Sequence, residues 1–179
     1  MAEAAIRTDR QALFHRLFPA GERPSMKTWT ILDCARDEQI YGHVLQTSNQ
    51  RCCLFAGALD PELAVAAPHL VALDPDDRLT ATLLNRGWGR AWGIFLRSDA
   101  PMGELRRHFR TFLRVRGPEG QYLLFRYYDP RVLSVYLPTC TPGELNAVFG
   151  ASVRAYFTEQ EDGDGLTEYR FDGQKLIQS

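Results

Sequence analysis

The sequence has no hydrophobic run long enough to cross a membrane, and its beginning does not have the pattern of a signal peptide. Charged residues interrupt the apolar residues of the first segment at Glu3, Arg7, Asp9 and Arg10. We therefore expect no membrane partner and a cytoplasmic location.

Cysteines are few and lack the spacing of a metal or redox site. The four residues are Cys34, Cys52, Cys53 and Cys140, and no C-x-x-C pair occurs. Adjacent cysteines on a strand point to opposite faces, so Cys52 and Cys53 are poor disulfide partners. We expect reduced, mostly buried thiols, as is typical of cytosolic proteins.

The chain also lacks an excess of either charge. It has 21 basic and 22 acidic residues, a formal net charge of −1. This balance gives no overall attraction to nucleic acid or to an anionic membrane, so such binding would need a local patch. Apolar residues make up 45% and charged residues 24% of the 179 residues, which is ordinary for one globular domain with a sizeable core.

Motifs of common enzymes are absent, including nucleotide-binding, zinc-protease and serine-hydrolase signatures. The glycine-rich 87–90 segment precedes a strand, so it cannot direct helix N–H groups at a phosphate. The 162–165 segment spaces two aspartates as calcium loops do, but it lacks the later glutamate, and we predict a hairpin turn there. The histidines lie on separate predicted elements, so we expect neither a metal nor a cofactor: His15, His43, His69 and His108.

An amphipathic helix is predicted near the N-terminus, with apolar residues at helical spacing from Ala5 to Phe18. Pro19 and Gly21 end it, and a joint extends to about residue 25. Packing against the domain and docking on a partner both remain open for this helix. We place the domain itself at residues 26–179.

From residue 26 onward, apolar strand patterns alternate with capped helical patterns. This alternation predicts the α/β class: a single-lobe mixed sheet flanked by helices on both faces, with a C-terminal β-hairpin. Strands are expected at 27–32, 52–55, 69–73, 92–96, 122–128, 153–159 and 166–171. Helices are expected at 38–45, 60–67, 77–84, 101–114, 130–137 and 142–149.

One predicted helix carries a basic face beside an apolar stripe. A solvated surface, an acidic protein partner and nucleic acid are the alternatives for this face. The balanced total charge argues against nucleic acid. The face consists of Arg106, Arg107, His108, Arg110, Arg114 and Arg116.

Two aspartates follow predicted strands, Asp33 and Asp129. Ligands of open α/β sheets bind where strands end, and paired carboxylates can perform acid–base chemistry or hold a cation. The alternative, which we favour, is structural. In that reading Asp129 caps the helix opened by Pro130, and Arg126 or Arg131 neutralises a carboxylate.

Several segments between Thr28 and Phe157, in this order, resemble the type VI secretion effector adaptors, also called effector chaperones. The sharpest are residues 92–96, 105–110, 123–133 and 137–138, with Phe149-Gly150 at the close. The resemblance implies a bacterial cytoplasmic protein that binds a toxic effector and loads it onto the VgrG spike, sometimes with a PAAR-type tip. It implies no catalysis, cofactor or metal.

Many members of that family continue into a second, mostly helical lobe, whereas here 30 residues follow Phe149 and have a hairpin pattern. We therefore expect a compact, single-lobe version. Aromatic and arginine side chains make strong contacts at interfaces, and a strand of the C-terminal hairpin could add a client strand. The predicted partner-binding residues are Trp88, Arg90, Arg106, Arg110, Tyr127, Tyr128 and Arg131.

Two other functions are alternatives to the adaptor. One is an enzyme for a phosphorylated or acidic small molecule, with Asp33 and Asp129 at the strand ends and arginines as anion clamps. The other is a nucleic-acid-binding regulator that uses the arginine-rich helix.

Overall fold

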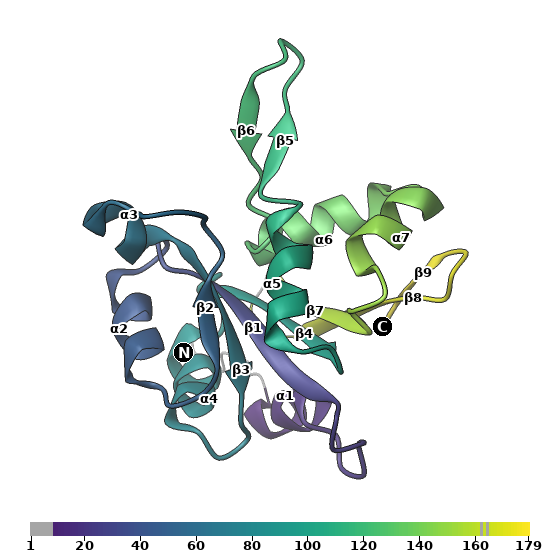
Figure 1. Ribbon diagram of the computed structural model, residues 1–179. Helices are drawn as coiled ribbons and strands as arrows, with labels where there is room; N and C mark the ends of the chain where they lie inside the picture. Colours follow the sequence, from purple (N-terminus) through teal and green to yellow (C-terminus); the bar gives the residue numbers. More distant parts are fainter. Residues whose placement is uncertain (1–8, 162, 164) are drawn as a thin grey trace, which may run out of the picture.

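The computed structural model describes residues 9–161, 163 and 165–179, and its main feature is one seven-stranded sheet (Figure 1). The strand order is β2-β3-β1-β4-β7-β8-β9, and a separate pair, β5-β6, forms a second sheet. The strands are β1 Lys27–Asp33, β2 Arg51–Cys53, β3 Pro68–Leu73, β4 Gly93–Ser98, β5 Arg114–Arg116, β6 Tyr122–Leu124, β7 Ala155–Glu159, β8 Leu166–Phe171 and β9 Leu176–Gln178.

The expected α/β class, a single sheet with flanking helices and a C-terminal hairpin, is confirmed. Every described strand pair is antiparallel, whereas we expected both directions to occur. A helix between two strands does not dictate their direction, because the chain can re-enter the sheet from either end. The alternation of elements therefore predicts the class but not the strand directions.

Most helix boundaries follow the capping signals in the sequence. Asp60 accepts a hydrogen bond from the backbone N–H of Glu62 at 3.0 Å, and Thr141 and Glu144 form a capping box. The helices are α1 Arg10–Leu17, α2 Glu38–Gln46, α3 Pro61–Ala66, α4 Arg78–Thr82, the π-helical turn η1 Leu83–Gly87, α5 Met102–Arg110, α6 Pro130–Thr139 and α7 Pro142–Phe149. None of the helices in these described ranges is long and apolar enough to span a bilayer.

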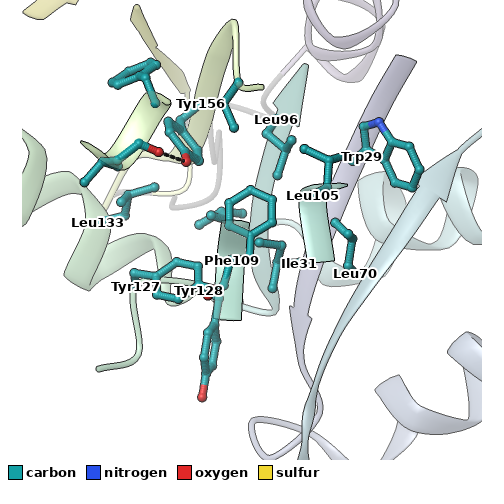
Figure 2. Packing of buried hydrophobic residues seen from close by; sticks show 14 of the residues in the cluster. Trp29, Ile31, Leu70, Leu96, Leu105, Phe109, Tyr127, Tyr128, Leu133 and Tyr156 are labelled. Atoms are coloured by element: carbon teal, nitrogen blue, oxygen red, sulfur yellow. Dashed lines mark hydrogen bonds between the residues drawn. The ribbon is translucent and has the colours of Figure 1, made fainter. Parts of the chain in front are cut away.

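The sheet separates two hydrophobic cores, which explains why β1 is buried from Thr28 to Asp33. On one face, Trp29 and Ile31 pack with α5, α6 and α7 (Figure 2). On the other, Leu32 packs with residues of α1, α2, α4 and η1. Alternate side chains of a strand point to opposite faces, so a strand with helices on both sides is buried on both faces.

Helix α1 packs against the domain. Leu13 and Leu17 are buried in the core, and Thr28 of β1 donates a hydrogen bond to the carbonyl of Leu17 at 2.6 Å. Arg16 donates to the carbonyl of Leu166 in β8 at 2.8 Å. The described part of the N-terminal helix is thus attached to the sheet; its predicted start at Ala5 and Ile6 lies outside the described residues.

The segment between α5 and α6 differs from the prediction. The expected helix to Arg114 ends at Arg110, and the expected buried strand at 122–128 is only the exposed β6. Strand β6 pairs with β5 around a turn in which Gly120 has a φ of 82°. The backbone N–H of Phe125 donates to the carbonyl of Leu113 at 2.9 Å, which closes the base of the hairpin. We call residues 114–124 the ribbon.

The predicted C-terminal hairpin is formed by β7 and β8, and β9 adds a further antiparallel strand. Asp162 and Asp164, the aspartates of the predicted turn, lie outside the described residues.

Candidate functional site

Three of the predicted partner-binding residues belong to the interior. Trp88, Tyr127 and Tyr128 are 8%, 4% and 2% exposed. The Trp88 Nε1 donates to the carbonyl of Gly163 at 3.2 Å, and the Tyr127 hydroxyl to that of Phe109 at 3.0 Å. Both tyrosines lie in the core shown in Figure 2. The sequence predicts these three aromatics as partner contacts, whereas in this structure the tertiary packing covers them.

The four predicted arginines have different environments. Arg90, Arg106 and Arg131 are exposed. Arg110 is half-buried, and its Nε donates to the carbonyl of Leu54 at 2.9 Å. Arg110 therefore holds the segment after β2 in place, while Arg90 and Arg106 present their charge to solvent.

Asp33 lies at the end of β1 and is fully enclosed, with a side chain 1% exposed. Its carboxylate accepts a hydrogen bond from Arg126 and another from the backbone N–H of Ala35, the latter at 3.2 Å. A buried carboxylate is costly unless it is paired and hydrogen-bonded, and these contacts meet both conditions. Asp33 is thus engaged in structural contacts.

Asp129 caps α6 and also pairs with Arg131. Its Oδ1 accepts from the backbone N–H of Arg131 at 3.0 Å, and the two oxygens accept from Nε and Nη2 of that residue at 2.9 and 2.6 Å. Burial acts to raise the pKa of Asp129, but the hydrogen bonds from Arg131 outweigh it and lower the pKa. The cap and arginine pair match the structural alternative for this residue.

A third carboxylate, Glu159 at the end of β7, fixes the glycine-rich loop. It accepts from the backbone N–H groups of Gly89 and Ala91 at 2.8 and 2.6 Å. Ala91 has a φ of 54°, an unusual conformation for a residue with a side chain. Burial raises the pKa of Glu159 despite these bonds. The glycine-rich segment therefore binds a carboxylate of its own chain.

We call Asp33, Arg126, Asp129, Arg131 and Glu159 the strand-end charge cluster. The cavity beside Glu159 measures about 10 Å³, room for about one water molecule. Residues 9–161, 163 and 165–179 contain no group of three or more candidate metal ligands. The Arg126–Asp33 pair joins the end of β1 to the segment that enters α6, and Glu159 joins the end of β7 to the glycine-rich loop.

A much larger concave surface lies elsewhere, beside the ribbon. It is a groove of about 600 Å³, which we call the apolar groove. Both of its charged lining residues are arginines. The lining consists of Leu54, Phe55, Ala56, Leu59, Leu63, Arg110, Leu113, Arg114, Tyr122, Leu123 and Leu124.

The ribbon that forms one wall of the groove extends away from the main sheet (Figure 1). Its register pairs Arg114 with Leu124 and Arg116 with Tyr122, which places these four side chains on one face. The Arg116 guanidinium lies 5.6 Å from the centroid of the Tyr122 ring, a cation–π contact. This face therefore combines apolar and positively charged side chains.

Exposed apolar residues concentrate around this groove. Of the nine large hydrophobic residues exposed in the described part of the chain, six belong to α3 or the ribbon. The sequence does carry a signal for the ribbon, since apolar residues flank the turn 117–120 on both sides. The signal is weak because the same residues continue into an apolar run to Tyr128. The six are Leu63, Val65, Val115, Tyr122, Leu123 and Leu124.

Comparisons with known proteins give one match. No curated protein and no solved structure matches the chain. The family model for a domain of unknown function, DUF4123, matches residues 28–147, which is more than half of the chain. The matched range runs from β1 into α7 and includes the ribbon and all residues of the apolar groove. It also includes every residue of the strand-end charge cluster except Glu159. The chain therefore belongs to the DUF4123 family.

Proposed function

We propose that this protein is a type VI secretion effector adaptor that binds a client protein stoichiometrically, without catalysis. The observation that carries the proposal is the apolar groove with its exposed ribbon. Tyr122, Leu123 and Leu124 are 65%, 45% and 51% exposed at three consecutive positions. Contiguous exposed apolar surface beside polar residues is typical of protein-binding sites.

The ribbon itself supports a binding role. An isolated pair of three-residue strands is marginally stable in water, and its exposed apolar side chains favour association. A client seated in the groove would cover these side chains and order the ribbon. Binding would also keep apolar client surface out of water until delivery.

The identity of the client comes from the motif resemblance. The segments at residues 92–96, 105–110 and 123–133 support an effector as the client and the VgrG spike, with or without a PAAR-type tip, as its destination. Loading an effector is a cytoplasmic step, which is the location we propose. Arg90 and Arg106, both exposed, stay predicted contacts for either partner.

The test is co-expression of the chain with the products of its neighbouring genes, followed by pull-down and gel filtration. We expect a stoichiometric complex with an effector or spike protein, and a client that is insoluble when it is expressed alone. If each product is expressed but none forms a complex with the chain, the adaptor function is refuted.

A further inference from the structure

We propose that the apolar groove binds an amphipathic helix of the client whose apolar face is bordered by acidic side chains. This inference rests on the proposed function, since it specifies what the same surface recognises.

The groove has apolar walls on two sides. Leu59 and Leu63 line the α3 side, Tyr122 and Leu124 line the ribbon side from one face of the ribbon, and Leu113, 7% exposed, also lines the groove. A helix carries apolar side chains at i, i+3, i+4 and i+7 on one face and can contact both walls at once. A strand added to the ribbon edge would use the ribbon backbone and would not need Leu63.

The positive charge of the groove lining favours a client helix whose apolar face is bordered by acidic side chains. Arg110 and Arg114 are its charged members, and Arg106 and Arg116 adjoin it along α5 and β5. Two hydrogen bonds fix the guanidinium of Arg110 on the carbonyls of Leu54 and Phe55. A guanidinium has five N–H donors, so these bonds use only part of its capacity. Glu62 and Glu119 lie on neighbouring segments but not in the lining.

The same charges disfavour a second copy of this chain as the occupant. A two-fold dimer places the same surface patch of both subunits together. Two grooves that met in this way would bring Arg110 and Arg114 of each copy close to those of the other. Like charges at an interface reduce affinity, whereas acidic client residues would pair with these arginines.

The probe is a fluorescein-labelled 15-residue helical peptide with leucines at i, i+3, i+4 and i+7 and glutamates along both borders. Two matched peptides carry lysines in place of the glutamates or a central proline. Binding to the full chain is measured by fluorescence anisotropy. We expect the glutamate peptide to bind at least about tenfold more tightly than either matched peptide.

Variants of the groove locate the site. Arg114→Glu should weaken binding of the glutamate peptide about tenfold and strengthen binding of the lysine peptide. Leu63→Asp should weaken binding of both peptides. The matched control is Leu45→Asp, at an exposed leucine of α2, and it should leave binding unchanged. Equal binding of the glutamate and lysine peptides, or full binding of the proline peptide, would overturn the inference.

Two further outcomes separate this inference from the proposed function. If the co-expressed client binds Leu63→Asp and Arg114→Glu as tightly as it binds the parent chain, the groove assignment is wrong and the adaptor function stands. If no client binds the parent chain but the glutamate peptide does, the adaptor function is wrong. A dimer in analytical ultracentrifugation that Leu63→Asp dissociates would make a second copy the occupant and overturn the inference.

Discussion

Arg126 donates a hydrogen bond to the enclosed carboxylate of Asp33, which lies 93 positions earlier in the chain. The contact joins the segment after the ribbon to the end of the central strand β1. Asp129 and Arg131 lie beside it and form their own pair. The family match includes all four residues, and their contacts give them a structural role at the end of the sheet.

Removal of Arg126 should therefore destabilise the fold. Arg126→Met leaves the Asp33 carboxylate buried without its charged partner, and we expect a loss of about 1–3 kcal/mol in the free energy of unfolding. The arginine side chain is 43% exposed, which keeps the effect below that of a fully buried pair. Urea denaturation measures it. The control is Arg154→Met, which breaks an exposed pair with Asp99 and should lower the free energy of unfolding by less than about 1 kcal/mol. Equal losses of stability in both variants would contradict the structural role of Arg126.

The Asp129 pair should make stability depend on acid pH. The pKa of Asp129 is lower in the folded protein than its ordinary value of 3.8, so its contribution is present above that value and is lost as pH falls through the lower pKa. Asp129→Asn retains a capping side chain but not the charge. In urea denaturation, the stability difference between the parent chain and this variant should be largest near neutral pH and shrink below about pH 4. A constant difference would show that the charge pair contributes nothing.

The exposed ribbon leucines should matter for association more than for folding. Leu123→Ser with Leu124→Ser should change the free energy of unfolding by less than about 1 kcal/mol, because surface changes cost little at each site. The double variant should bind the glutamate peptide about tenfold more weakly than the parent chain does. Fluorescence anisotropy and urea denaturation measure the two properties. A large loss of stability would mean that these side chains pack inside the protein.

The end of α7 requires a glycine. Gly150 has a φ of 55°, and a Cβ there would lie 3.0 Å from the Cε1 of His108. Gly150→Ala should cost about 1–3 kcal/mol, because the backbone conformation and the contact are both unfavourable. Gly143→Ala in the first turn of the same helix, where a Cβ meets nothing within 4 Å, should be neutral or stabilise by up to about 1 kcal/mol. Thermal denaturation compares the melting temperatures of the two variants, and similar shifts from the parent value would refute the prediction.

The four described cysteines are free thiols, and Cys34 should be the least reactive. It is 3% exposed, and burial raises its pKa to about 12. Because the thiolate is the reactive form, DTNB at pH 8 should modify Cys34 only after denaturation. Cys53, which is half-buried, serves as the comparison. Rapid modification of Cys34 in the folded chain, shown by mass spectrometry, would contradict the packing.

Local signals in the sequence determined most of the elements. Caps at Asp60 and Thr141 and the glycine at position 150 predict helix boundaries that the structure confirms. The strands predicted at 27–32 and 92–96 are present as Lys27–Asp33 and Gly93–Ser98. These features act within a few residues of the chain, so periodicity and capping chemistry are sufficient to predict them. The α/β class follows from the alternation of the same elements.

The tertiary structure alone decided which residues are available to a partner. Trp88, Tyr127 and Tyr128 have the composition of an interface, but tertiary packing buries them. Trp88 donates to the carbonyl of Gly163, 75 positions away, and Tyr127 to that of Phe109, 18 positions away. The leucines at 123 and 124 have the composition of a core strand, but the described elements leave them 45% and 51% exposed. Burial depends on contacts between segments far apart in sequence, and a local pattern carries no information about which segments meet. For the same reason, only the fold could bring Leu63 of α3 opposite the ribbon.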